Sequence, residues 1–422
     1  MRELYKDVAF VRFFSGRVIT NLGDSLYLIG ALWLVHDLTG SAALTGVAGF
    51  LLRAPQIIQF LVGPLVDRWD LRRTLVSTQI LQGVFVLAVP FASFVDALSV
   101  WVVLAVIPTL ALIARLQYPA QSAMLPQIVE DDQLVRANSM FKLTGRSADI
   151  AFNAGAGFLI ALVGATQLFL FNAVTFGIAT LLFMGVQLPN APEEDEDEAE
   201  SEKTAEEDPF DEYLSDLREG ITYLRGSLLV PIAVGGMIAN FGSGIMTAVF
   251  PAFADTFGGP EMYGILMSSL AAGTVVGSAA SWLVEDLPYG VFGIVGYGVS
   301  AVAMLAAVFF KGAIVTPALF FVALMPVGSF NVLLGSLLQS SVEQEFLGRV
   351  SSTFSSLTML TLPVGSLVGG LVAGAFSPSV ALYLFGGLLG VLVVYFLFNA
   401  QIRTLPQVSK LTADQMGLGT EV

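Results

Sequence analysis

Few side chains in this sequence could carry acid–base or nucleophilic chemistry, and their scarcity excludes several classes of site. The 422 residues include no cysteine and a single histidine, His36. A thiolate nucleophile, a disulfide framework, a Cys-type metal site and a His cluster are therefore excluded. Ionisable groups at membrane depth are costly and are functional candidates by default. Six ionisable residues stand inside long apolar stretches: Arg17, Asp24, Arg53, Arg115, Arg146 and Asp149.

Asp24 is the acid that the sequence places deepest. Arg17, Asn21 and Asp24 are spaced by four and three residues, so they share one face of a helix. Asp24 lies twelve residues before the polar stretch 36–41, and Arg53 lies twelve residues after it. At about 1.5 Å per residue, both would lie about 18 Å below that stretch on neighbouring antiparallel helices.

We therefore predict an Asp24–Arg53 pair, with two roles open. Arg53 could approach Asp24 in one conformation only, so that Asp24 takes up a proton in one state and releases it in the other. The pair could equally be a permanent ion pair that holds two helices together. Arg115, Arg146 and Asp149 are predicted nearer the cytoplasmic ends of their segments, where snorkelling satisfies them.

The elements that must position these residues are transmembrane helices. The sequence is 55% hydrophobic and 13% charged, with a mean hydropathy of +0.78, whereas a soluble protein carries roughly a quarter charged residues. Apolar segments of about 20 residues, enough to cross a bilayer, recur along the chain. We predict an all-α membrane protein with twelve spans: 13–35, 42–65, 74–94, 99–119, 143–163, 166–187, 228–251, 263–283, 290–310, 313–338, 351–376 and 380–398.

The basic residues predict the orientation. With a cytoplasmic N-terminus, fourteen of the 19 Lys and Arg residues fall on the inner side, and the outer loops hold only Lys311. Both termini are then cytoplasmic in a multi-pass protein of the plasma membrane. The net charge is −15, and the exposed segments are rich in acids and poor in lysine. This composition favours a prokaryotic source, with a high-salt cytoplasm as one option.

A hydrophilic insert divides the spans into two sets of six. The run "APEEDEDEAESEKTAEEDPFDE" at 191–212 is too acidic to bury a core and is predicted to be a solvated linker. The following apolar residues have helical spacing and predict an amphipathic helix on the membrane surface. The predicted domains are a six-helix bundle at 1–187, a linker at 188–227, a second bundle at 228–400 and a tail at 401–422.

The two halves carry an internal repeat. "TNLGDS" at 20–25 matches "ANFGSG" at 239–244 at an offset of 219, and "VEDDQLVRAN" from Val129 matches "VEQEFLGRVS" from Val342 at an offset of 213. The chain is therefore predicted to be a six-helix unit duplicated in parallel. In the second copy Asp24 becomes Ser243. Asn240, Ser243 and Thr247 form an uncharged polar stripe, which we predict to face a substrate cavity.

A cluster of charged residues after the second span, at 67–73, carries the family resemblance. Gly63, Asp67, Arg68 and Arg72 match the pattern G-x-x-x-D-[RK]-x-G-[RK]-[RK]. With "LVRAN" and "FLGRV" at 134–138 and 346–350, this resembles the major facilitator superfamily, in the drug/proton antiporter branch that includes macrolide and siderophore exporters. Asp70 and Leu71 depart from the pattern. The resemblance implies two pseudo-symmetric six-helix bundles and a conformational latch in which Asp67 faces the other bundle.

Three functions compete at this point. The leading hypothesis is a secondary-active exporter of a small amphipathic or hydrophobic compound, coupled to protons or, in a salty habitat, to sodium. The second is an ion-coupled symporter that imports a nutrient. The third is a non-transporting scaffold or intramembrane enzyme, but no nucleophile or metal constellation supports an enzyme. We expect no cofactor, metal or nucleic-acid partner, contacts with membrane lipids, and a monomer.

The predicted orientation can be tested directly. A tag inserted in the 191–212 linker is expected to be accessible only from the cytoplasm, because the adjoining loops are rich in basic residues. Antibody access in intact and permeabilised cells measures this. Labelling of the tag in intact cells would invert the topology.

Overall fold

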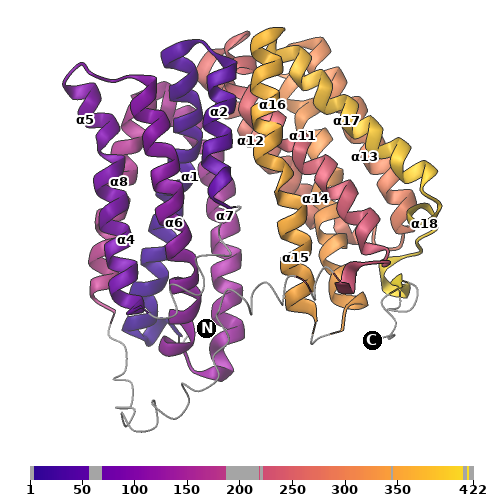
Figure 1. Cartoon of the computed structure of the whole chain (residues 1–422), viewed down its shortest axis with the longest axis horizontal. Helices are drawn as coiled ribbons and strands as arrows, with labels where there is room; N and C mark the ends of the chain where they lie inside the picture. Colours follow the sequence, from indigo (N-terminus) through magenta and orange to yellow (C-terminus); the bar gives the residue numbers. More distant parts are fainter. Residues whose placement is uncertain are drawn as a thin grey trace. The chain divides into compact units, whose positions relative to one another are not determined.

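The computed structural model describes residues 4–56, 69–186, 218, 222–343, 346–411 and 416–417 (Figure 1). In these ranges the chain is helical and contains no strand, which confirms the all-α prediction. Ten of the described helices or helix pairs are long and apolar enough to cross a membrane. The other two expected spans are α2 (Ala42–Arg53), whose continuation lies outside the described residues, and α7 (Asp131–Val163).

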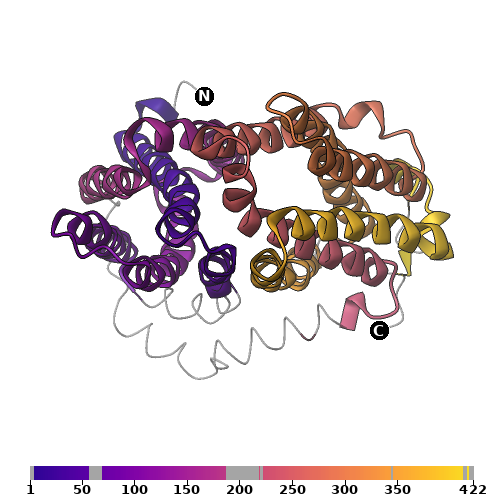
Figure 2. The ribbon, with the colours of Figure 1, turned by 90° about the horizontal axis from the view of Figure 1, so that it is seen from above.

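The chain separates into two compact units by its contacts. Unit 1 comprises residues 1–34 and 54–214, and unit 2 comprises 35–53 and 215–422. Figure 2 shows the helices of unit 1 end on. Its helices are α1 (Val8–Thr39), whose last turns belong to unit 2, α4 (Leu71–Val86), α5 (Ala88–Phe94), α6 (Val100–Ile128), α7 and α8 (Ala165–Met184).

Unit 2 contains the second half of the chain together with α2. Its helices are α11 (Leu229–Asp255), α12 (Gly259–Ala279), α13 (Tyr289–Phe310), α14 (Val315–Ser341), α15 (Leu347–Met359), α16 (Thr361–Ala375), α17 (Pro378–Phe398) and α18 (Ala400–Arg403). Helices α15 and α16 follow each other as one span. Large apolar side chains such as Phe94, Phe309 and Phe398 are exposed on both units, as expected of helices that face lipid rather than water.

The charged cluster at 67–73 includes a helix cap. Asp70, which departs from the family pattern, is the N-cap of α4, and its carboxylate accepts a hydrogen bond from the Arg73 backbone N–H at 2.8 Å. The Thr74 hydroxyl donates to the Asp70 carbonyl oxygen at 2.9 Å. Gly63, Asp67 and Arg68 lie outside the described residues, so the latch that they imply stays a prediction.

Arg72, the fourth residue of that pattern, contacts the end of α8. Its guanidinium donates to the carbonyl oxygen of Met184. Arg12 of α1 donates to the next carbonyl, that of Gly185. Cations at a helix C-terminus satisfy its unpaired carbonyls and complement the helix dipole. Arg72 therefore ties the start of α4 to the end of α8 within unit 1.

Glycine contacts confirm the internal repeat in three dimensions. Gly16 and Gly23 of α1 lie against α8, where a Cβ on Gly16 would meet the Phe183 ring at 2.6 Å. A Cβ on Gly235, at the position equivalent to Gly16, would meet the Phe396 ring of α17 at 3.3 Å. The two glycines, on α1 and α11, are 219 residues apart, and the two phenylalanines, on α8 and α17, are 213 residues apart. These are the two offsets seen in the sequence.

The second copy of the Gly23 contact follows the same rule. A Cβ on Gly23 would overlap Asn172 and Thr175 of α8, and a Cβ on Gly242 would overlap the Phe385 ring of α17. Phe385 stands 213 residues after Asn172. Each unit therefore packs its first membrane helix on its sixth through equivalent glycines, as small residues allow in membranes.

Arg72→Gln is expected to lower the free energy of unfolding by about 0.5–1 kcal/mol, because the end of α8 loses a cation bonded to its carbonyl. Arg73→Gln is the control for loss of a charge, since the Arg73 side chain is 88% exposed and its guanidinium pairs locally with Asp70 at 3.6 Å, and an exposed pair of this kind contributes little to stability. Thermal unfolding of the two purified variants in detergent measures the difference. Equal midpoints would show that the Arg72 contact does not stabilise unit 1.

Candidate functional site

Asp24 lies half-buried on α1, and its carboxylate is close enough to two side chains of unit 1 to interact electrostatically. One is the Arg115 guanidinium on α6, and the other is Tyr27, one turn further along α1. The predicted partner Arg53 belongs to unit 2, so the Asp24–Arg53 pair stays a prediction. Among the described side chains of unit 1, Arg115 is a cation in electrostatic range of Asp24.

The prediction that Arg115 lies near the cytoplasmic end of its span is wrong. Helix α6 continues to Ile128, nine residues beyond the predicted end, because the polar sequence after Arg115 keeps its helical conformation. Arg115 then stands fifteen residues from the first residue of α6, and Asp24 stands fifteen from the last residue of α1. Both lie about 22 Å along their helices from the same expected side.

Helix α7 is also longer than predicted. It begins at Asp131 rather than near residue 143, so Asp149 stands fourteen residues before its end and at a similar depth to Asp24. The side chains of Arg146 and Asp149 are outside the described part of the chain. Sequence reasoning missed the shared depth because hydropathy locates apolar stretches but does not show how far a helix extends beyond them.

The face of α1 that carries Arg17 and Asn21 lies along α7. The Arg17 guanidinium stands 4.6 Å from the centre of the Phe141 ring, a cation–π contact. One turn on, a Cβ built on Gly145 would lie 3.6 Å from the Asn21 amide nitrogen. These two contacts advance by four residues on each helix, so α1 and α7 run in parallel register. Arg17 and Asn21 thus line the α7 side of α1.

Tyr27 supplies a hydroxyl group in electrostatic range of the Asp24 carboxylate. Its ring packs edge to face on Phe169 of α8, with centroids 5.4 Å apart. Its hydroxyl is buried and has no hydrogen-bond partner within the described residues. A phenol of this kind can donate a proton or accept one. Asp24, Arg115 and Tyr27 therefore form an acid, a cation and a hydroxyl donor in one region.

A neighbouring face of α1 meets buried amides that sequence reasoning missed. The Thr20 hydroxyl lies 3.0 Å from the Gly16 carbonyl oxygen and 3.2 Å from Oε1 of Gln79 on α4. Asn172 and Thr175 of α8 bond to each other at 3.2 Å beside Gly23. These residues and Gln82 are buried. Polar residues in the apolar stretch "STQILQG" were the available signal.

These contacts of Thr20 and Gly23 with α4 and α8 fix the rotation of α1. Helices α4 and α8 also pack on each other, so Thr20 and Gly23 fit into a junction of three helices. The Gly23 position admits no side chain, because a Cβ there would overlap Oγ1 of Thr175 and Oδ1 of Asn172. With that face held, Asp24, the next residue, is turned about 100° away from Gly23 and lies in electrostatic range of Arg115.

The predicted stripe of unit 2 is uncharged and locally satisfied. Asn240, Ser243 and Thr247 are half-buried on one face of α11. Each bonds to the carbonyl four residues earlier, at 3.0, 2.9 and 2.9 Å. Such bonds to the same helix leave the side chains able to accept a further hydrogen bond. The stripe can therefore offer weak polar contacts but no charge.

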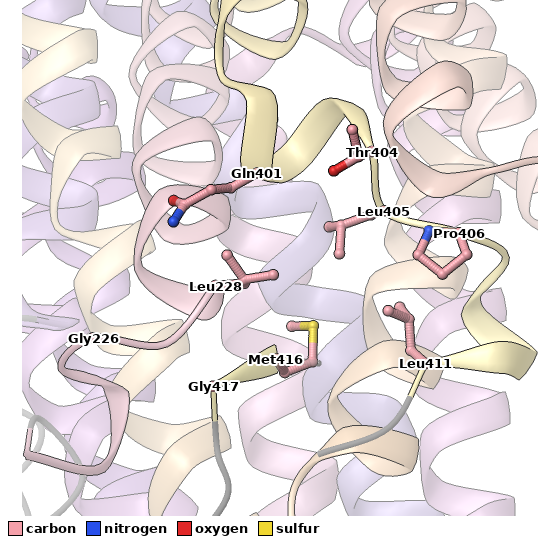
Figure 3. A pocket seen from close by; sticks show the side chains of 9 residues that line it. All are labelled: Gly226, Leu228, Gln401, Thr404, Leu405, Pro406, Leu411, Met416 and Gly417. Atoms are coloured by element: carbon pink, nitrogen blue, oxygen red, sulfur yellow. The ribbon is translucent and has the colours of Figure 1, made fainter. Parts of the chain in front are cut away.

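A separate cavity of about 510 Å³ lies at the end of unit 2 where the chain finishes (Figure 3). It opens between the segment before α11, at Gly226 and Leu228, and the segment after α18. Met416 accepts a hydrogen bond from the Leu228 N–H at 2.9 Å through its carbonyl oxygen. The nine lining residues include no charged side chain. None of the sequence-predicted site residues lines this cavity.

Comparison with known proteins identifies the fold and the family together. The profile of the Major Facilitator Superfamily matches residues 13–362, which is most of the chain. The chain belongs to the Major Facilitator Superfamily. It is thus a membrane transporter with twelve expected helices in two six-helix bundles, and members of this superfamily act on small-molecule substrates.

Its relatives in this superfamily include efflux proteins. The chain is 22% identical to macrolide efflux protein A of Streptococcus pyogenes over 385 residues, covering 86% of this chain and 89% of that protein. It is 23% identical to the multidrug efflux pump Tap of Mycobacterium bovis over 399 residues, covering 88% of each. The crystal structure of the nucleoside transporter NupG superposes with a TM-score of 0.68 at 13% identity, covering 93% of this chain and 98% of NupG.

Gly23→Ala is expected to impair transport, because the added methyl group pushes α1 away from α8 and shifts Asp24. Overpacking of this kind typically costs about 1–3 kcal/mol. Gly177→Ala on α8 is the matched control, since a Cβ there meets nothing within 4 Å. Thermal unfolding and substrate flux in proteoliposomes measure both effects. If the two variants behave alike, α1 does not depend on this contact.

Proposed function

We propose that this transporter exports a small amphipathic or hydrophobic compound by alternating access, in exchange for protons. The observation that carries the proposal is the placement of Asp24. It lies half-buried midway along a membrane helix, with the Arg115 guanidinium and the Tyr27 hydroxyl in electrostatic range. A carboxylate in such a place can change its protonation when its neighbours move.

The coupling follows from two opposing effects on one carboxyl group. Removal from water favours its neutral form, and a nearby guanidinium favours its charged form. When Arg115 lies close, Asp24 releases its proton. When a change of conformation or a bound substrate separates them, Asp24 takes a proton up. Arg53 is a second candidate for the cation in another state, as the sequence suggests.

The substrate class is inferred from the polar stripe on α11 and from the related efflux proteins. The two relatives above are named for macrolide and multidrug efflux. The stripe of Asn240, Ser243 and Thr247 on α11 offers hydrogen bonds without charge, which suits a compound recognised mostly by apolar contact. Import of a nutrient by symport is the alternative, and flux measurements on this chain must separate the two.

Other parts of the proposal concern topology and the latch. Both termini and the acidic linker are placed in the cytoplasm by the basic residues. Asp67 and Arg68 form the cytoplasmic latch that the family pattern implies, whereas Arg72 already bonds within unit 1 to the end of α8. Sodium replaces the proton if the source is halophilic. The protein is proposed to act as a monomer in the plasma membrane.

Asp24→Asn is expected to abolish gradient-driven accumulation of substrate while preserving substrate binding, because the amide cannot exchange a proton. Asp37→Asn, on the exposed last turn of α1, is the matched control and should transport normally. Flux of a panel of lipophilic compounds into proteoliposomes, driven by a pH gradient, measures this. Arg115→Gln should shift the pH optimum of transport upward, because the charged form of Asp24 loses its positive neighbour.

A permanent ion pair predicts a different pattern. Each single variant would then leave a buried charge unpaired and lose about 3–5 kcal/mol of stability. The double variant Asp24→Asn, Arg115→Gln would restore both stability and driven transport. That restoration would rule out coupling through Asp24.

A further inference from the structure

The only histidine of the chain is placed against an acid at one end of unit 2. His36 lies in the last turn of α1, and its side chain is 8% exposed. Its Nε2 stands 3.4 Å from Oδ2 of Asp255, the last residue of α11, whose side chain is 60% exposed. A buried imidazole therefore faces a carboxylate that is open to water. The contact joins residues 219 positions apart in the sequence.

Beside this pair, α2 is packed tightly on the second half of the chain. Helix α2 lies next to α16 (Figure 1) and also contacts α11. A Cβ on Gly46 would come within 2.7 Å of the Gly370 Cα atom, and a Cβ on Gly49 would lie 3.8 Å from the Ala248 Cβ. The segment 36–53 therefore forms one contact surface with α11 and α16 inside unit 2. At Gly46 and Gly370 the two backbones meet with no side chain between them, and we call this contact seated when it is formed and separated when it is broken.

Asp255 is the charged group placed to respond to His36. The other titratable or charged groups at this end are Asp37 on α1, Glu261 and the Tyr263 phenol on α12, and Lys311 before α14. The Lys311 ammonium lies 6.0 Å from the Phe253 ring centre. Neither the first turns of α2 nor α16 contains an ionisable residue. Histidine is the side chain whose ordinary titration falls between pH 5 and 8.

We propose that His36 is a proton-binding site that controls whether the ends of α1 and α2 stay seated on α11 and α16. With a neutral imidazole, the contact with Asp255 is at most one long hydrogen bond. With a protonated imidazole, it becomes an ion pair beside the glycine contact, and the seated condition is favoured. Separation would leave a partly buried cation without its carboxylate, which is unfavourable.

The direction of this effect fits the proposed antiport, on which its physiological meaning rests. By the predicted topology, residues 36–41 face the outside. A proton arriving from outside would favour the seated condition of the segment 36–53 on α11 and α16 after substrate release. Ligands shift a conformational equilibrium by their difference in affinity for the two states, and here the ligand is the proton. His36 would then act before Asp24 in each proton's path.

The absence of cysteine allows a direct measurement. Ala43→Cys places the sole thiol on α2, where the Ala43 Cβ lies 3.1 Å from a Cβ built on Gly374 of α16. Ile314→Cys, at a side chain that is 83% exposed, is the reference for thiol chemistry. The rate of maleimide labelling at Ala43→Cys, divided by the rate at Ile314→Cys, reports separation of α2 from α16. Purified protein in lipid nanodiscs makes the measurement independent of topology.

In the Ala43→Cys protein, this ratio is expected to fall roughly twofold to fivefold from about pH 8 to about pH 5.5, as for a partly exposed ion pair. His36→Gln should give a high ratio at every pH, and His36→Arg a low ratio at every pH. Asp255→Asn should also remove the pH response, and it changes a mostly exposed side chain, so folding is preserved. A pH response that persists in His36→Gln overturns the proposal, as do equal ratios for the Gln and Arg variants.

Flux measurements separate this proposal from the proposed function. A pH-dependent ratio in a protein that shows no proton-driven flux would support the His36 site and reject proton antiport. Proton-driven flux with a ratio that does not change with pH would support antiport and reject the His36 site.

Discussion

Close approach of helix backbones at glycine is the constraint on which the rest of this transporter depends. Lipid offers no hydrophobic drive for one helix to leave it for another, so association depends on contact area and small residues. In unit 1 the packing of Gly16 and Gly23 on α8 sets both the distance and the rotation of α1. The rotation decides which residues of α1 contact the buried amides of α4 and α8 and which point away from them. The chemistry of Asp24 is therefore set by its neighbour Gly23, which has no side chain.

The same constraint explains why duplication could diverge in function. Gly235 and Gly242 reproduce the packing in unit 2, against Phe396 and Phe385 of α17. In unit 1 the equivalent contact partners of Gly23 are the polar Asn172 and Thr175. Once glycines set the geometry, the partner side chains were free to change from amide and hydroxyl to phenyl. Unit 1 thus places buried amide and hydroxyl groups against its first helix, whereas the equivalent contact in unit 2 is made by phenyl rings and α11 carries an uncharged polar stripe.

Much of the fold and part of the site could be predicted from the sequence. Hydropathy and the offsets of 219 and 213 gave the helices and the duplication, because both are local or periodic properties. The face shared by Arg17, Asn21 and Asp24 followed from helical spacing. Arg115 was misplaced because α6 continues through polar residues, and helix length beyond an apolar stretch is decided by packing. The pairing of Thr20 with Gln79 could not be predicted, since it depends on the rotation of two helices.

The proposed proton sites differ in the physics that would make them respond. Asp24 is removed from water and depends on a guanidinium that must move relative to it, so its protonation follows the conformation. His36 is buried, but its partner Asp255 is open to water, so protons reach this end without a pathway through the protein. A site such as His36 can change the conformation when it binds a proton, and a site such as Asp24 changes its protonation when the conformation changes. Placing them about 18 Å apart along α1, by twelve residues of helix rise, lets one continuous helix carry both functions. Helix α1 crosses from unit 1 into unit 2 at residues 34 and 35, so a movement of its end is a movement of the element that holds Asp24.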